Sequence, residues 1–180
     1  MFELGGTSKR IFFVTLAAAC LVTLPSLADG VDQAVDALHQ TCLAHGPDFE
    51  RTVAQAATRR WTPLSGYAAL APVNEVSAFR AWEADEELPS GTMIAVTRGN
   101  MDGRAVQTCT VKLPNVDRAQ FEERFFERTD AEKIGETRTG SQVSKLYILV
   151  AGNRKQLVHL TSMAVSGRSD IIIVSSIVDD

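Results

Sequence analysis

Apolar residues recur at helical spacing in two stretches near the start of the chain. In the first stretch, four of them share one helical face: Val31, Val35, Leu38 and Cys42. This pattern predicts a helix over residues 31–44, and Phe49 begins a similar pattern that extends to about residue 60. Gly46 and Pro47 end the first helix and begin the second. The two stretches together predict an N-terminal helical hairpin.

A third helical pattern follows a stretch rich in proline and glycine. Asn74 is a suitable N-cap, and Val76, Phe79 and Trp82 then follow at intervals of three residues. We therefore expect a short helix from Asn74 to about Trp82. The acidic run that follows, which begins at Glu83 and includes Asp85, Glu86 and Glu87, is interpreted as a solvated polar segment. Its carboxylates are close in sequence and do not form the pattern of a glycosidase acid and base.

Strand patterns dominate the second half of the chain. Runs of β-branched and apolar residues between turn signals predict five strands, over residues 93–97, 104–113, 142–150, 156–164 and 170–178. In the second of these strands, alternation places Cys109 on the apolar face and Thr110 and Lys112 on the other face. A helix over about residues 115–128 separates the second strand from the third.

These elements predict an α+β fold with a single antiparallel sheet of about five strands, an N-terminal helical hairpin, and helices packed on one face of the sheet. The predicted order from residue 93 onward is strand, strand, helix, strand, strand, strand. This order is similar to that of the profilin-like and PAS-like folds. The similarity concerns element order alone, so no function is transferred with it.

The first 28 residues have the layout of a secretory signal peptide. Lys9 and Arg10 precede an apolar run over residues 11–24, and Ser26 and Ala28 supply small residues before a cleavage site. The run of about 14 residues is shorter than the roughly 20 that a spanning helix needs. We expect cleavage after Ala28, which divides the chain into a signal peptide, 1–28, and a single exported domain, 29–180. Lipidation at Cys20 and an uncleaved anchor are the alternatives.

Export changes the interpretation of the cysteines. Cys42 and Cys109 remain after cleavage, and an even number of cysteines in an exported chain predicts a disulfide bond. Both lie on faces expected to be buried. The formal net charge of −4 gives the chain no general attraction to nucleic acid, and no apolar run after the signal reaches the length of a membrane span.

Histidines and cysteines offer one cluster for metal or nucleophilic chemistry. His39, Cys42 and His45 are spaced by three residues, and His159 is the remaining histidine. However, His39 and His45 are six residues apart and point to different sides of a helix. We therefore expect no metal site, and a disulfide or core role for the cysteines rather than catalysis. No cofactor-binding motif is present, so we expect no cofactor, and no catalytic residue is assigned.

Four aromatic residues suggest a binding surface before the sheet begins: Trp61, Tyr67, Phe79 and Trp82. Exposed aromatic residues of this kind bind proteins or glycans. The alternative is that Phe79 and Trp82 belong to the ordinary core.

The sequence favours an exported, non-enzymatic binding module of the cell envelope, in a periplasmic or secreted setting. Its partner would be an envelope protein or a small ligand, as for an inhibitor or immunity protein. The alternative is a periplasmic hydrolase that uses His39, His45 or His159 as a base. A structural envelope component is a third possibility. The pattern specifies neither a particular ligand nor an oligomeric state.

Overall fold

The computed structural model describes residues 27–68, 71–84, 88–163 and 171–180. Over these residues it contains one eight-stranded antiparallel sheet in the order β1-β2-β3-β4-β8-β7-β6-β5. The five predicted strands are all present, as β3 Met93–Met101, β4 Arg104–Leu113, β6 Gln142–Ala151, β7 Arg154–Met163 and β8 Ile172–Asp179. Residues 1–26, which hold most of the predicted signal peptide and Cys20, lie outside the described residues, as do Asp85, Glu86 and Glu87.

The prediction of about five strands is wrong, because three further strands complete the sheet. These are β1 Thr62–Leu64, β2 Glu75–Glu83 and β5 Glu132–Thr139. β5 is an edge strand with mostly exposed, polar residues, so it lacks the alternation that marks a half-buried strand. β1 has only three residues, too few to show a pattern.

β2 occupies the segment for which a short helix was expected. The spacing of Val76, Phe79 and Trp82 suits a helix, but in the strand Phe79 and Trp82 face opposite sides of the sheet. A register shift between Val76 and Ala78 interrupts the period of two. Pairing with β3 along nearly the whole strand satisfies the backbone, and this tertiary interaction outweighs the local helical pattern.

Helices occupy the other predicted positions. α1 Leu27–Leu38 continues into a π-helical turn, η1 His39–Leu43, and α2 Phe49–Thr58 follows. α3 Arg118–Arg128 lies between β4 and β5. The side chains of Asp48 and Asp117 cap α2 and α3 by accepting hydrogen bonds from the backbone N–H groups of Arg51 and Gln120. α1 and α3 lie side by side, and Arg128 of α3 forms ion pairs with Asp32 and Asp36 of α1.

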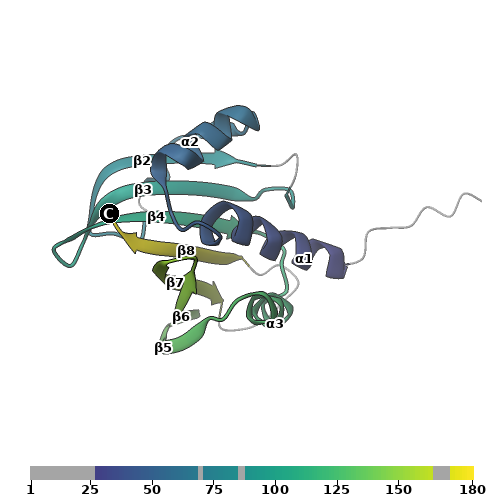
Figure 1. Cartoon of the computed structure of the whole chain (residues 1–180). Helices are drawn as coiled ribbons and strands as arrows, with labels where there is room; N and C mark the ends of the chain where they lie inside the picture. Colours follow the sequence, from purple (N-terminus) through teal and green to yellow (C-terminus); the bar gives the residue numbers. More distant parts are fainter. Residues whose placement is uncertain (1–26, 69–70, 85–87, 164–170) are drawn as a thin grey trace, which may run out of the picture.

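All these helices contact the same face of the sheet (Figure 1). The backbone N–H of Phe49 in α2 donates to the side chain of Gln107 in β4, and Cys42 of η1 meets Cys109 two residues further along that strand. The strand register places Cys109 on the same face as Tyr147 of β6, whose ring packs 5.8 Å from that of Phe125 in α3. The main hydrophobic core lies between this helical face and the helices.

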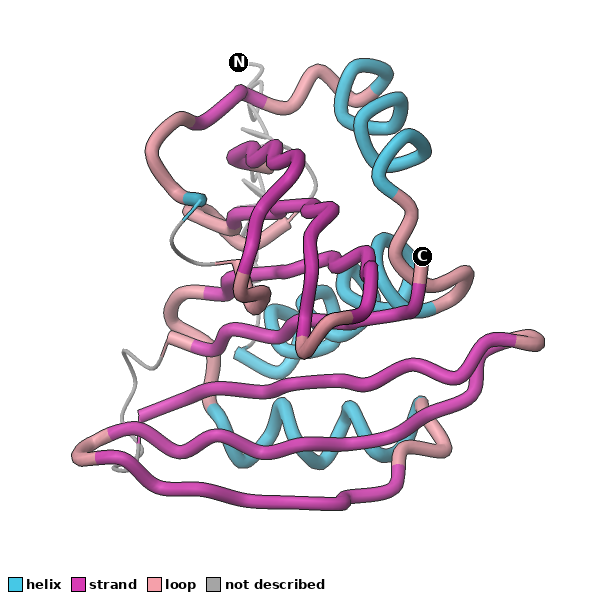
Figure 2. Tube along the Cα trace, turned by 90° about the vertical axis from the view of Figure 1, so that its left-hand side faces the viewer, coloured by secondary structure: helices cyan, strands magenta, loops and turns pink. Residues whose placement is uncertain are grey.

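The sheet is strongly twisted. β2, β3 and β4 run across the view of Figure 1, whereas β5, β6 and β7 are seen lengthwise only after a 90° turn, in Figure 2. A cumulative right-handed twist of this kind is the normal result of about 20–25° between neighbouring strands. The twist separates the two ends of the sheet, and β8 occupies the centre between β4 and β7.

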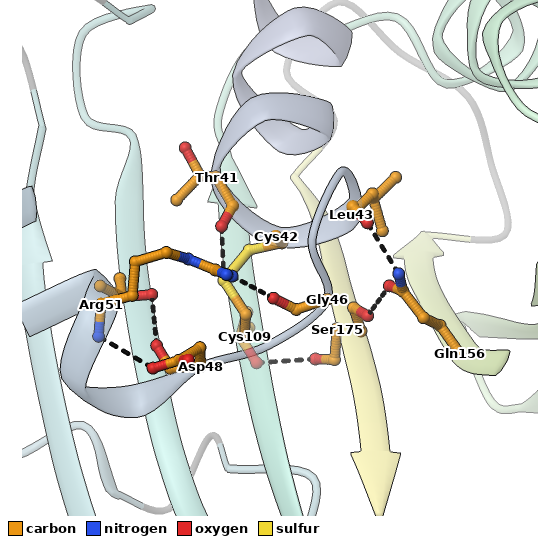
Figure 3. Close-up of a disulfide and its surroundings, with 12 residues drawn as sticks. Thr41, Cys42, Leu43, Gly46, Asp48, Arg51, Cys109, Gln156 and Ser175 are labelled. Carbon is orange, nitrogen blue, oxygen red and sulfur yellow. Dashed lines mark hydrogen bonds between the residues drawn. A yellow bond between two sulfur atoms is a disulfide. The ribbon is translucent and has the colours of Figure 1, made fainter. Parts of the chain in front are cut away.

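A disulfide bond fastens the helical layer to the sheet. Cys42 of η1 and Cys109 of β4 form the pair predicted from the sequence, with Cα atoms 5.4 Å apart (Figure 3). In the π turn, the N–H of Ala44 donates to the carbonyl oxygen of His39, five residues back. Beside it, the side chain of Gln156 in β7 donates to the carbonyl oxygen of Leu43 and accepts from the hydroxyl of Ser176. Both bonds are 2.7 Å long.

Candidate functional site

The structure separates the four aromatic residues that the sequence grouped together. Trp61 and Trp82 are only 7% and 6% exposed, and their ring centroids lie 6.4 Å apart in the core on the helical side. Tyr67, in the connection between β1 and β2, is 38% exposed. Phe79 is half-buried on the face opposite Trp82. The two tryptophans therefore belong to the core, and of these four residues only Tyr67 and part of Phe79 are accessible.

The face opposite the helices is called here the rear face. Its central row crosses six strands: Ala81, Ala95, Thr110, Ser175, His159 and Leu146. Flanking rows contain half-buried apolar side chains: Phe79, Ile148, Leu157 and Ile173. An antiparallel sheet face turned to water usually carries polar residues. The rear face instead combines small hydroxyl residues with apolar ones.

The central row does not form an accessible nucleophile. The hydroxyls of Ser175 and Thr110 lie 2.8 Å apart, and Ser175 is only 3% exposed. His159 is the direct cross-strand neighbour of Ser175, and its Nε2 lies 3.4 Å from the hydroxyl of Thr161. Burial lowers the pKa of His159, because desolvation disfavours the imidazolium. A Ser-His reaction requires an open hydroxyl beside the base, whereas this hydroxyl is enclosed and engaged with Thr110.

A cavity of about 380 Å³ opens at one end of the rear face. It is called here the Glu83–Lys112 cavity. Its lining comes from the last residues of β2 and β4, the first of β3, and the neighbouring connections: Leu64, Tyr67, Glu83, Ser90, Gly91, Met93, Lys112, Pro114 and Asn115. Clefts of roughly 300–1,000 Å³ with a few polar groups are typical of small-molecule sites.

Strand register fixes the order of side chains in this cavity. Glu83 pairs with Met93, and Met93 pairs with Lys112, so these three residues form one row on the rear face. The carboxylate and the ammonium group are therefore two strands apart, or about 10 Å between Cα atoms. Glu83 and Lys112 are half-buried, and neither forms an ion pair or side-chain hydrogen bond with another described residue. The cavity thus presents a negative and a positive group across an apolar floor.

Turns at the end of the sheet shape the walls of the cavity. Gly91 has φ +80° and lies two residues before β3, and Asn115 has φ +57° and lies two residues after β4. Both belong to the left-handed region that glycine and asparagine tolerate best. Of the lining residues, Lys112 is the one that alternation in the sequence places on the face opposite Cys109, and Tyr67 is one of the predicted binding residues. The interpretation of Glu83 as part of a solvated acidic run does not anticipate its position in the lining.

The histidine and cysteine cluster is not brought together as a metal site. Cys42 is in the disulfide bond, His45 is exposed, and His39 borders a separate cavity of about 270 Å³ that also includes Arg128 and Val150. Within the described residues there is no group of three or more potential metal ligands. His159 lies on the rear face. A further cavity of about 240 Å³, near Arg104 and Asp179, lies at the other end of the sheet.

Comparison of the chain with protein families, with curated proteins and with solved structures gave no match. Any function of the chain must therefore be inferred from its own residues. Among the helices in the described part of the chain, none has the length and apolar character needed to cross a bilayer.

Proposed function

We propose that the chain is an exported, non-enzymatic binding protein of the cell envelope that holds a small ligand in the Glu83–Lys112 cavity. The observation that carries this proposal is the cavity itself, where two opposite charges without a partner among the described residues flank Met93. Each charge can form a charge-assisted hydrogen bond with a ligand group of opposite charge, and such bonds are shorter and stronger than neutral ones. Tyr67 adds a partly exposed aromatic ring at the same place.

Export is supported by two independent features. The first 28 residues have the charge and hydropathy pattern of a signal peptide. The disulfide between Cys42 and Cys109 is typical of proteins in an oxidising compartment such as the periplasm. Together they favour a binding protein that meets its ligand outside the cytoplasm.

The positions of the histidines favour binding over hydrolysis. His39, His45 and His159 are the candidate bases, and none of them lines the Glu83–Lys112 cavity. The proposal also favours a small ligand over a protein partner, because the two tryptophans expected to anchor a protein interface are buried in the core.

Native mass spectrometry tests this function. The protein is purified under non-denaturing conditions from the cell envelope fraction, and its mass is compared before and after denaturation. We expect a non-covalent adduct that is released on denaturation. The Tyr67→Ala variant should lose most of the adduct, whereas Val150→Ala, at an exposed position outside the cavity, should keep it. A wild-type protein without an adduct, or equal adducts in both variants, would contradict the proposal.

A further inference from the structure

We infer that the ligand of this cavity is a small zwitterion, a free amino acid or a dipeptide with an unblocked ammonium group and an unblocked carboxylate. This inference rests on the proposed function and specifies its ligand. Glu83 would receive the ammonium group and Lys112 the carboxylate. The apolar part of the ligand would lie over Met93, between the two strand ends.

The spacing of the two charges sets the size of the ligand. Glu83 and Lys112 are separated by Met93 in one cross-strand row, so their Cα atoms are about 10 Å apart and their side chains stand on the same face. Two charge-assisted hydrogen bonds occupy about 2.8 Å each. When both side chains extend perpendicular to the sheet, their charged groups keep about the Cα spacing, and about 4–5 Å then remain between the charged ends of the ligand. One residue of extended chain spans about 3.5 Å. One or two residues fit this span.

The remaining lining explains why a charged ligand would also carry an apolar side chain. Met93 is buried at the floor of the cavity, and Leu64 and Tyr67 contribute from the first strand and the connection that follows it. Methionine adapts its shape to irregular apolar groups, and an aromatic ring adds contact area at low entropic cost. We therefore choose leucine and alanyl-leucine as probes.

Opposite charges give a selectivity that a single charge does not. A ligand with only an ammonium group leaves Lys112 unpaired, and a ligand with only a carboxylate leaves Glu83 unpaired. Each blocked end should therefore weaken binding independently. Each charged end of the ligand is also assigned to one residue of the cavity. The inference can therefore be tested by measuring how blocked ligands bind to variants of Glu83 and Lys112.

Isothermal titration calorimetry on the whole oxidised protein provides the test. The probes are L-leucine, L-alanyl-L-leucine, the N-acetyl dipeptide, the dipeptide amide, and the dipeptide blocked at both ends. We expect one of the two free zwitterions to bind at least about tenfold more tightly than its blocked forms. Equal affinity for free and doubly blocked dipeptide, or no binding of either free zwitterion, would overturn the inference. Neither result would affect an adduct found by native mass spectrometry, so the proposed function would stand.

Two variants test which residue of the cavity binds each charged end of the ligand. Glu83→Gln should weaken binding of the free dipeptide about tenfold and leave the N-acetyl dipeptide unaffected, because that ligand has no ammonium group. Lys112→Gln should also weaken binding of the free dipeptide about tenfold, and it should leave binding of the dipeptide amide unaffected because that ligand has no carboxylate. Glu75→Gln, at an exposed position on the same strand as Glu83, is the matched control and should bind as the wild type does. If both variants weakened all ligands equally, the assignment of ends would be wrong.

Discussion

Among single residues, the fully buried side chain of Gln156 is important for stability because it forms two buried hydrogen bonds. Its amide group joins the carbonyl oxygen of Leu43 in the π turn to the hydroxyl of Ser176 in β8. Gln156→Leu would leave both groups buried without this partner, at about 1–3 kcal/mol for each. We expect the free energy of unfolding to fall by about 3 kcal/mol in urea titrations. Gln142→Leu, at an exposed position on β6, should change it by less than about 0.5 kcal/mol.

His159 should make stability depend on pH. Burial lowers the pKa of this imidazole in the folded state, so below about pH 6.5 the unfolded chain binds more protons than the folded chain does. The contribution of His159 to stability is therefore complete above that pH and is lost as the pH falls. Urea titrations between about pH 7 and 5 should show a shallower loss of stability for His159→Gln than for the wild type. The same change in the free energy of unfolding with pH in both proteins would contradict a lowered pKa of His159 in the folded state.

The surroundings of a residue were predictable where apolar and polar residues alternate strongly. In β4 this alternation predicts that Cys109 and Lys112 lie on opposite faces, and this arrangement positions both the disulfide and one charge of the cavity. The prediction for Glu83 was wrong, because the carboxylates that follow in the sequence suggested a solvated segment. The environment of Glu83 depends on Tyr67 and Lys112, which come from distant parts of the chain. No local pattern contains that information.

At the scale of elements, α3 offers a matched pair of phenylalanines. Phe125 is fully buried and packs against Tyr147 of β6, whereas its neighbour Phe126 is 40% exposed. Phe125→Ala should lower the free energy of unfolding by about 3–5 kcal/mol, through lost burial and the cavity left behind. Phe126→Ala should cost clearly less, although its ring also contacts Tyr147. Equal losses in denaturant titrations would show that α3 docks by a different face.

Elements in which apolar residues recur with a clear helical or strand period were predictable, and elements without such a period were not. α2 and β4 follow the sequence pattern closely, since capping residues or alternation mark them. β2 was mistaken for a helix, because a register shift breaks its alternation and pairing with β3 determines its conformation. β5 gave no signal, because an exposed edge strand needs no apolar face. These two strands account for most of the difference between the predicted and the observed sheet.

At the scale of the whole molecule, the disulfide fastens residues far apart in the sequence. Cys42 and Cys109 are separated by 67 positions, and the chain-entropy relation gives such a loop about 4 kcal/mol of stabilisation. Reduction should lower the melting temperature by an amount on the order of 10 °C. The Cys42→Ala/Cys109→Ala double variant should melt near the reduced wild type and be insensitive to reductant. A melting temperature unchanged by reduction would contradict this role for the bond.

The order of strands in the sheet was beyond prediction from local patterns. β8 ends the described chain but lies at the centre of the sheet, between β4 and β7. Apolar residues occupy both faces of β8, as is typical of a strand in the middle of a sheet. The neighbours of β8 depend on long-range pairing, as does the meeting of three strand ends around the Glu83–Lys112 cavity.

We propose that ligands bind in the Glu83–Lys112 cavity and not in either of the other two cavities described above. Amide chemical-shift mapping of the isotopically labelled protein against a library of small polar fragments tests it most directly. We expect hits to shift the amide signals of Glu83, Met93 and Lys112 together. Hits confined to the cavity near His39 and Arg128, or to that near Arg104 and Asp179, would contradict it, as would a library without any hit at Glu83, Met93 and Lys112.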